Sequence, residues 1–591
     1  MKLIWRYLKK YAWVVALAVG IKFCGTLAEL SLPYVLEHII DDIVPGHDLG
    51  MVILWGSIMF IGAVLARVLN VSANRKAIRN AHLVSYDVRQ ALFEKVMRLT
   101  GAQVDEIGLP SLISRMTSDS YNVQSLFRSL QTLCIRAPIL LVGGILFTLT
   151  LDVHLALILV AMLPLLVVII VVVSRQGIPL YAKVQKKLDA VVRIMRESIT
   201  GIRVVKALGR EEQENRRFGT ANADMAASDI TAGTVMAIPQ PALQLCLNLG
   251  LILVVVLGAR RVDAGLMKPG IILAFLTYFN MIANGVMGVS RIFIAISQSS
   301  ASADRIDAVL QMDTSGNILP AAEAPAPSGD GHIRFEHVDF SYGSSTVSGK
   351  HAALGPGAFD GNGREKTLSD IDFTLQRGES LGIIGPTGCG KTSVINLLMR
   401  FYEPDAGHIF VDGQDIRTYS PDALRQKFGT VFQNDMVFHE SLRDNIRFER
   451  DVEGQAIRTA VESAMAAGFI DELEDGLDYE AAIRGANLSG GQKQRILVAR
   501  ALAADPEILI LDDSSSALDY RTDAAMRRAI LQHYGNATLI MISQRVSSVM
   551  GLDHVMVLDN GRIIGYGTHE ELMDTCPAYR ETYLQQTGLD A

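Results

Sequence analysis

The sequence has little cysteine and no excess of basic residues. Its formal net charge at neutral pH is −7, which argues against a protein that binds nucleic acid, because such proteins carry a basic surface. The five cysteines have neither the spacing of metal ligands nor that of a disulfide framework. We therefore expect reduced thiols at Cys24, Cys134, Cys246, Cys389 and Cys576.

Apolar residues, in contrast, are abundant. They make up 49% of the 591 residues, and the mean hydropathy is positive. A membrane-spanning helix requires about 20 mostly apolar residues. Six stretches satisfy this requirement, and we predict spans at about 12–36, 50–73, 127–150, 154–175, 238–259 and 270–297. The fourth span carries no charge from Leu155 to Val173, whereas Asn280, Asn284 and Arg291 interrupt the sixth.

The distribution of positive charge predicts which side of the membrane each segment faces. Lys and Arg are concentrated before the first span, between spans two and three, and between spans four and five, and such segments face the cytoplasm. Both termini are then cytoplasmic, in a multi-pass protein of the cytoplasmic membrane. The acidic segment Asp41–Asp48 lies outside, together with Arg260, Arg261 and Lys268, which are exceptions to the charge rule. Met1–Lys10 is basic and amphipathic and predicts an interfacial helix.

The sequence divides into two halves of different composition. In the first, the cytoplasmic segments contain few Gly or Pro residues, so we expect the spans to continue as helices beyond the bilayer. Gly108-Leu-Pro110 and the pair Gly201 and Gly209 interrupt these segments where a short crossing helix would fit. Residues 313–330 are rich in Ala and Pro and predict a linker. The predicted architecture is therefore an α-helical membrane domain with six transmembrane helices at 1–312, followed by an α/β domain at 331–591.

The strongest functional motif is Gly385-Pro-Thr387-Gly388-Cys389-Gly390-Lys391-Thr392. It follows the strand-like run Ser380–Ile384 and precedes a helix-like run that begins at Ser393, which is the context of a P-loop. The glycines let backbone N–H groups surround phosphate oxygens, and the helix N-terminus adds partial positive charge. We expect Lys391 to contact the β- and γ-phosphates and Thr392 to bind Mg²⁺. The motif therefore predicts ATP and Mg²⁺ as ligands.

A second element of this site is the run Ile508-Leu-Ile-Leu511-Asp512. Its four apolar residues predict a buried strand, and the carboxylate at its end can hold Mg²⁺ through a water. Buried strands that end in Asp are common. The position of this one downstream of the P-loop favours a shared phosphate site.

Between these two elements lies Leu488-Ser489-Gly490-Gly491-Gln492. Serine is a common helix N-cap, and the N-terminus of a helix attracts anions. With a P-loop before it and the Asp512 strand after it, this run resembles the signature of the ABC ATPase family. The resemblance implies that Ser489, Gly490, Gly491 and Gln492 close over the γ-phosphate bound to the other half of a dimer.

The resemblance covers nearly the whole chain. It implies that Tyr342 stacks on adenine, that Gln433 contacts Mg²⁺ and the membrane domain, and that Ser516-Ala-Leu-Asp519 crosses the dimer interface. The membrane half resembles an exporter-type ABC half at Ser114–Asp119, Glu197–Glu212 and Ala301–Arg305. The α/β domain is thus expected to be an ABC ATPase domain in a half-transporter. We assign no function to the Gly/Ser-rich insertion Gly343–Lys366.

Two departures from the family pattern concern catalysis, and a smaller one is Ile483, where exporters often have an acidic residue. Asp513 stands where active members have a Glu that polarises the attacking water. Asp is shorter by one methylene, and a misplacement of about 1 Å can cost about 10²-fold in rate. Gln544 stands where the family usually has a His that contacts the γ-phosphate, and an amide cannot become cationic. Gln433, which matches the family pattern, is the third catalytic position. The two departures predict a site that binds ATP but hydrolyses it slowly.

The departures predict a heterodimer. In the family, each composite site combines the P-loop of one chain with the signature of the other. A homodimer of this chain would have two slow sites, whereas its intact signature would complete the site of a partner. We therefore expect a second ABC half-transporter that carries Glu and His at the two altered positions.

The predicted function is ATP-driven efflux of hydrophobic or amphipathic compounds across the membrane. The alternatives are a lipid or peptide exporter subunit and a nucleotide-gated regulatory subunit that does not pump. Charged residues at membrane depth are candidates for substrate contacts. Lys22 and Glu29 lie seven residues apart in the first span, so they either pair with each other or contact substrate. Arg67 and Arg136 lie at membrane depth or near it, and the alternative for Arg67 is that it extends to the cytoplasmic rim.

Overall fold

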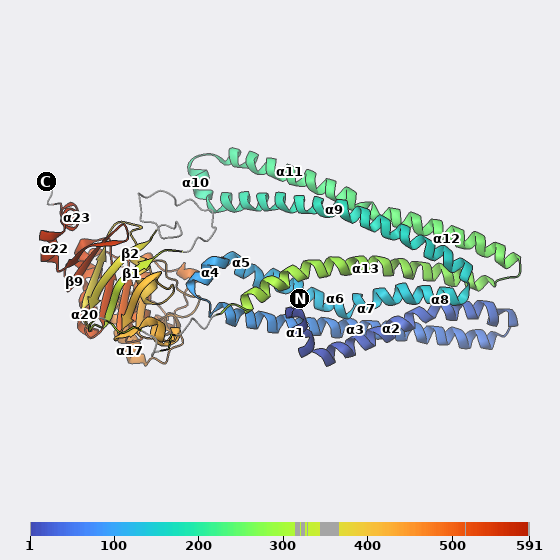
Figure 1. Cartoon of the computed structure of the whole chain (residues 1–591), viewed down its shortest axis with the longest axis horizontal. Coiled ribbons are helices and arrows are strands. Elements are labelled where there is room, and N and C mark those ends of the chain that lie inside the picture. Colours follow the sequence, from blue (N-terminus) through green and yellow to red (C-terminus); the bar gives the residue numbers. More distant parts are fainter. Residues whose placement is uncertain are drawn as a thin grey trace. The chain divides into compact units, whose positions relative to one another are not determined.

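The structure, a computed structural model, describes residues 2–313, 319–320, 325–327, 329–342, 366–514 and 516–588. Most of the Gly/Ser-rich insertion and parts of the predicted linker therefore lie outside the described residues. The chain forms two compact units, one of Met1–Met97 and Pro110–Met312, the other of Arg98–Leu109 and Asp313–Ala591. Figure 1 shows helices throughout the first unit and the sheets of the second.

Long helices build the first unit. Among the described residues, six helices are long and apolar enough to cross a membrane, which confirms the expected number of spans. They are Ala12–Gly46, Leu49–Val96, Leu109–Leu151, Val153–Thr200, Gln244–Asp263 and Pro269–Phe293. The individual helices are α1 (Lys2–Lys10), α2 (Ala12–His38), α3 (Leu49–Val96), α5 (Leu109–Ser114), α6 (Ser120–Gln131), α7 (Leu133–Pro138), α8 (Gly144–Leu151), α9 (Val153–Thr200), α10 (Ile202–Ala207), α11 (Glu211–Ala237), α12 (Pro239–Asp263) and α13 (Pro269–Leu310).

Aspartate side chains determine where two of these helices begin. Asp48 caps α3 by accepting hydrogen bonds from the N–H groups of Gly50 and Met51. Asp152 caps α9 in the same way and separates the third span from the fourth. Each of the two helices has 48 residues, or about 72 Å at 1.5 Å per residue. A bilayer core is only about 30 Å thick, so both helices continue beyond it as expected.

Short helices lie where the sequence predicts crossing helices, and a glycine follows each of them. Helix α4 (Gly101–Ile107) ends at Gly108, whose φ is 80°. Helix α10 lies between Gly201 and Gly209, whose φ is 59°. Both φ values lie in a region that side chains rarely adopt. Helix α4 belongs to the second unit, where Asp105 accepts a hydrogen bond from the Tyr402 hydroxyl.

Ion pairs neutralise two of the cations that depart from the charge rule. Arg261 lies 3.0 Å from Asp152, at the turn between the third and fourth spans. Lys268 pairs with Asp42, in the π-helical turn Ile39–Ile43 that follows α2. Because each positive charge is matched by a carboxylate, these residues add little net charge to their loops.

The second unit contains two sheets. Strands β2, β1, β4 and β5 form an antiparallel sheet, and the other sheet has the order β10-β9-β3-β8-β7-β6. In the latter, strands β9, β3, β8, β7 and β6 are parallel. The strands are β1 (Ile333–Phe340), β2 (Leu368–Leu375), β3 (Ser380–Ile384), β4 (Ala406–Val411), β5 (Gln414–Asp415), β6 (Phe428–Val431), β7 (Ile508–Asp512), β8 (Thr538–Ile542), β9 (His554–Asp559) and β10 (Arg562–Gly567).

Helices connect and cover these strands. Helix α14 follows β3, and α19 precedes β7, so the two predicted phosphate-site elements belong to the central sheet. The helices of the second unit, apart from α4, are α14 (Lys391–Leu398), α15 (Pro421–Arg425), α16 (Leu442–Arg447), α17 (Gly454–Ser463), α18 (Ala467–Asp471), α19 (Gly490–Leu502), α20 (Tyr520–His533), α21 (Val546–Val549), α22 (His569–Thr575) and α23 (Pro577–Thr587).

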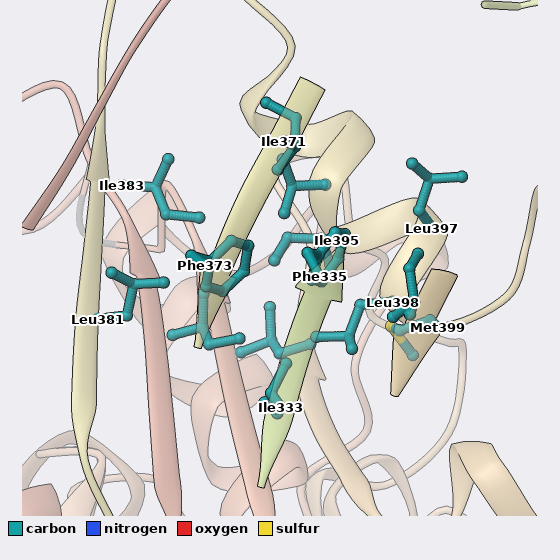
Figure 2. Close-up of a cluster of buried hydrophobic side chains, with 14 of the residues drawn as sticks. Ile333, Phe335, Ile371, Phe373, Leu381, Ile383, Ile395, Leu397, Leu398 and Met399 are labelled. Carbon is teal, nitrogen blue, oxygen red and sulfur yellow. The ribbon is translucent and has the colours of Figure 1, made fainter. Parts of the chain in front are cut away.

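A buried apolar core joins the two sheets (Figure 2). Phe335 of β1 stacks on Phe373 of β2, with ring centroids 4.7 Å apart. Ile383 of β3 and Ile395 of α14 pack into the same cluster. Burying a side chain of this size contributes about 1.5–3 kcal/mol. The core therefore holds α14, and with it the end of the P-loop, against the central sheet.

Candidate nucleotide site

The loop between β3 and α14 has a backbone that requires glycine. Gly388 and Gly390 have φ values of 87° and 105°, which side chains rarely adopt. A Cβ on Gly385 would lie 2.1 Å from the carbonyl oxygen of Leu558, and a Cβ on Gly390 would lie 2.6 Å from Leu368 Cδ2. The loop is therefore kept free of side chains where it enters α14, as a phosphate cradle at a helix N-terminus requires.

Lys391 and Thr392 are held over this loop by specific contacts. The Lys391 ammonium donates hydrogen bonds to the carbonyls of Gly385, at 2.7 Å, and Pro386, at 2.8 Å. The Thr392 hydroxyl donates to Asp512 at 2.9 Å. A hydroxyl beside a carboxylate is a donor set suited to a hard cation such as Mg²⁺. The fold thus joins the two predicted magnesium ligands, which are more than a hundred residues apart in sequence.

The carboxylate of Asp512 is almost completely buried at the end of β7, with 2% of the residue exposed. Burial raises the pKa of Asp512, and the neighbouring Asp513 raises it further, whereas the hydrogen bond from Thr392 lowers it. The charged form of this side chain is therefore disfavoured in the protein alone. A bound divalent cation would relieve that penalty.

Asp513 follows Asp512 directly and lines the cavity described below. Its φ is 49°, and its N–H donates to the Ile542 carbonyl at 3.0 Å. Burial raises the pKa of Asp513, while the hydrogen bond with Gln433 and the positive charges of Arg545 and Lys391 lower it. The backbone of Asp513 is thus fixed by β8, and its short side chain is engaged with Gln433.

The loop that carries Gln544 is fastened by the C-terminal helix. Gln586 of α23 donates to the Gln544 carbonyl and accepts from the Val546 N–H, both at 2.8 Å. The Gln544 side chain lines the same cavity as Asp513. Sequence reasoning missed Gln586, because no local motif connects it to a loop 42 residues earlier in the chain.

Tyr342 stands at the opening of the site, with 39% of the residue exposed. Its hydroxyl lies 3.1 Å from Ser393 Oγ. Its ring meets Phe340 and Tyr402 edge-on, with centroids 4.8 and 5.1 Å away. These contacts fix the plane of the ring and leave part of its surface accessible to a planar ligand.

The cavity that these elements enclose has a volume of about 270 Å³. It brings together predicted residues from five separate segments, namely Tyr342, Thr387, Gly388, Gly390, Lys391, Thr392, Ser393, Gln433, Asp512, Asp513 and Gln544. Gly385 and Cys389 do not line this cavity. The carbonyl of Gly385 accepts a hydrogen bond from Lys391, and the Cys389 side chain is buried.

Sequence reasoning did not single out Thr367, Ile542 or Ser543, which also line the cavity. Thr367 donates its N–H to the Phe340 carbonyl at 2.8 Å, so the pairing of β1 with β2 places it near Tyr342. Only that pairing, across the intervening insertion, could have revealed its position.

The signature residues lie on a different surface of the same unit. Ser489 caps α19, and its hydroxyl accepts from the Gln492 N–H while the Gln492 side chain accepts from the Ser489 N–H. Asp519 caps α20 by accepting from the Thr522 N–H at 2.9 Å. Gln494 ties the two segments together through hydrogen bonds to Ser516 and Ala517. Neither the signature nor Asp519 lines the cavity of its own chain.

Six apolar helices long enough to span a membrane, joined to a P-loop domain that holds phosphate-site residues around one cavity, are the parts of an ATP-driven membrane transporter. Family models support this class in both units. The model described as "ABC transporter transmembrane region" matches residues 15–286, and the model described as "ABC transporter" matches residues 368–516.

Comparisons over the full length give the family. An uncharacterised ABC transporter ATP-binding protein of Mycobacterium tuberculosis is 32% identical, over 99% of this chain and 98% of its own. The uncharacterised ABC transporter ATP-binding protein YfiB of Bacillus subtilis is 31% identical over 98% of both chains. The chain therefore belongs to the ABC transporter family. A solved bacterial Atm1-family ABC exporter with ATP bound has the same fold, with a TM-score of 0.79 and 23% identity over 99% of both chains.

Proposed function

We propose that this chain is the slow-site subunit of a heterodimeric exporter that moves hydrophobic or amphipathic compounds out of the cell. The observation that carries the proposal is the pair Asp513 and Gln544 in the wall of the nucleotide cavity. Among the described residues that line it, neither a glutamate nor a histidine is present. The cavity keeps the groups that bind phosphate and lacks the long carboxylate and the imidazole that favour hydrolysis.

The residues divide into two roles. Tyr342 would stack on the adenine, and the P-loop from Gly385 to Ser393 would bind the phosphates. Thr392, Asp512 through a water, and Gln433 would hold Mg²⁺, which would neutralise phosphate charge when bound. Asp513 and Gln544 occupy the positions that act on the attacking water and the γ-phosphate. ATP would therefore bind firmly and be cleaved slowly.

The signature surface would act on the partner. Ser489, Gly490, Gly491 and Gln492 lie outside the cavity of their own chain, and Ser489 and Gly490 are exposed at the N-terminus of α19. Such a terminus can contact the γ-phosphate of ATP held by another chain. We therefore place most hydrolysis at a site formed by this surface and the P-loop of a second half-transporter, with Asp519 at the interface.

The proposal includes a location and a division into domains. The protein would lie in the cytoplasmic membrane, with both termini and the ATPase domain in the cytoplasm. Its membrane domain would comprise residues 1–312, its linker 313–330 and its nucleotide-binding domain 331–591. Labelling of cysteines introduced at Asp48 and at Ser228 with an impermeant reagent on intact cells tests this arrangement. Labelling at Ser228 rather than at Asp48 would contradict it.

Mixed variants of the purified pair test the assignment of the two sites. The partner is sought by co-purification with the tagged full-length chain. Ser489→Ala in this chain should lower the ATPase rate of the pair at least about tenfold, because it removes a donor of the partner's site. Lys391→Ala, which damages this chain's own P-loop, should lower it much less. Equal losses, or brisk ATPase from this chain alone, would contradict the proposal.

Transport distinguishes the remaining functions. Proteoliposomes that contain the pair should accumulate a hydrophobic dye against its gradient only with ATP. Movement of labelled lipid or peptide instead would assign the alternative cargo. Nucleotide-dependent conductance without uphill transport would favour a regulatory subunit that does not pump.

A further inference from the structure

A polar cavity of about 210 Å³ lies in the first unit, between α2, α3 and α7. Helix α2 packs against both α3 and α7 (Figure 1). Three cations, one carboxylate and two amides supply its polar lining, namely Lys22, Arg67, Arg136, Glu29, Asn70 and Asn74. The cavity is separate from the nucleotide site, which belongs to the second unit.

The charges in this cavity do not cancel. Glu29 pairs with Arg136 at 2.7 Å, so it does not pair with Lys22 on its own helix. Lys22 instead donates to the Asn74 side chain at 3.1 Å and is only 3% exposed. Within the described part of the chain, neither Lys22 nor Arg67 has a carboxylate within 4.0 Å. Two positive charges therefore remain uncompensated.

The position of the cavity makes this excess costly. Arg67 comes 18 residues after Leu49, the first residue of α3, or about 27 Å along the helix. The apolar core of a bilayer is about 30 Å thick, so Arg67, which is exposed, lies near the edge of that core remote from the α2–α3 turn, whereas Lys22 is buried in the bundle. Unpaired charges within a membrane are expensive and mark functional sites. An anion in the cavity would offset the excess.

Asn70 adds a second requirement. Its Nδ2 donates to the Ala66 carbonyl at 2.9 Å, which fixes the orientation of the amide. Its Oδ1 is buried and has no hydrogen-bond partner. A buried acceptor without a donor destabilises the fold. A ligand with a hydroxyl beside its anionic group would satisfy both Asn70 and the cations.

We infer that this cavity binds the headgroup of an anionic amphipathic compound, a phosphate or carboxylate with a neighbouring hydroxyl. The inference rests on the proposed export function and gives the chemical class of its substrate. Arg67 and Lys22 would hold the anion, Asn70 would accept from the hydroxyl, and the apolar part of the compound would lie against the spans. Glu29 restrains Arg136 and so limits the affinity.

Binding to the full-length chain in neutral detergent tests this inference without ATP or a partner. Native mass spectrometry would compare short-chain phosphatidylglycerol, which has the required headgroup, with the matched phosphatidylcholine, which is zwitterionic. Cholate, below its micellar concentration, supplies a carboxylate and hydroxyls that do not come from a lipid. Binding of phosphatidylglycerol alone assigns a lipid headgroup, and binding of cholate assigns a free amphipathic anion. Equal binding of all three, or binding of none, would overturn the inference.

Two substitutions should act in opposite directions. Arg67→Gln removes an uncompensated charge and should weaken binding of the preferred anion at least about tenfold. Glu29→Gln frees Arg136 and should tighten it. Arg260→Gln, which removes an exposed cation of α12 outside the cavity, is the matched control and should change nothing. Weakening by both cavity substitutions would indicate a structural role and refute the inference. If the pair that carries Arg67→Gln transports substrate as well as the unaltered pair, the assignment of this cavity is refuted, while the proposed export function stands.

Discussion

If the nucleotide site is slow, as we propose, exchanging Asp513 and Gln544 for the residues typical of the family should make it faster. The double variant Asp513→Glu, Gln544→His places a longer carboxylate and an imidazole in the wall of the existing cavity. The N–H of Asp513 is bonded to Ile542, and the Gln544 loop is fastened by Gln586. Both new side chains would therefore start from backbone positions that the fold already determines.

The expected gain follows from the geometry. One methylene adds a bond of about 1.5 Å, and a misplacement of about 1 Å costs about 10²-fold in rate. A rate increase of 10²-fold corresponds to about 2.7 kcal/mol of transition-state stabilisation. We expect Asp513→Glu alone to raise the ATPase rate of the purified chain about 10- to 100-fold. Gln544→His should add to this gain, because an imidazole can donate to the γ-phosphate.

The assay is phosphate release from the full-length chain in nanodiscs, with ATP binding measured in parallel. Lys391→Ala in the double variant should abolish the gain, which shows that it arises at this P-loop. Asp513→Asn is the complementary control and should leave the low basal rate nearly unchanged. If the double variant binds ATP as well as the unaltered chain but hydrolyses it no faster, the explanation from carboxylate length and imidazole chemistry is wrong.

Three further predictions concern the second unit. Burial raises the pKa of Asp512, so its charge destabilises the fold increasingly as pH rises through that pKa. Asp512→Asn should therefore raise the midpoint of thermal unfolding at pH 7 by about 2 °C or more and abolish the further stabilisation by ATP with Mg²⁺. A lower midpoint without nucleotide would contradict this prediction. Burial lowers the pKa of His332, so its contribution to stability is complete above its ordinary pKa of about 6.5 and is lost as pH falls. Calorimetry should show that His332→Asn reduces the loss of stability in acid. His337→Asn, which alters an exposed histidine, should not reduce it. Tyr402→Phe removes the hydrogen bond to Asp105, and hydrogen bonds to charged groups are strong. The substitution should reduce the stimulation of the ATPase rate by substrate at least about threefold and leave the affinity for ATP unchanged. Full stimulation would show that this contact is dispensable.

Much of the fold is predictable because its determinants are local. Each predicted span is an apolar run of sufficient length, and Asp152 separates the third from the fourth by capping α9. Gly108, Gly201 and Gly209 mark the short helices α4 and α10. The helix ends extend well beyond the predicted spans, since helices continue into water wherever no Gly or Pro stops them.

The site is predictable only where one motif carries its geometry. The P-loop combines strand, glycines and helix within a dozen residues, so its sequence specifies its shape. The partners of side chains across helices are different in kind. Lys22 and Glu29 share a helix, yet they bond to Asn74 and Arg136 on other helices. Which helix faces which depends on packing over the whole bundle, and a periodic pattern does not contain that information.

The same contrast explains how ATP binding and hydrolysis can be separated in one chain. A side chain on Gly385 would collide with a backbone carbonyl, and Gly388 and Gly390 have backbone conformations that other residues rarely adopt. Replacing these glycines would therefore disturb the fold along with phosphate binding. Asp513 and Gln544, by comparison, lie in the wall of the cavity, and backbone hydrogen bonds to Ile542 and Gln586 hold them. The φ of 49° at Asp513 favours a short polar side chain there, whereas no such preference applies at Gln544. On the proposed function, a subunit whose partner performs hydrolysis can therefore lose a Glu and a His at these positions and still bind ATP. The structure thus constrains the binding residues far more strongly than the residues that would set the rate.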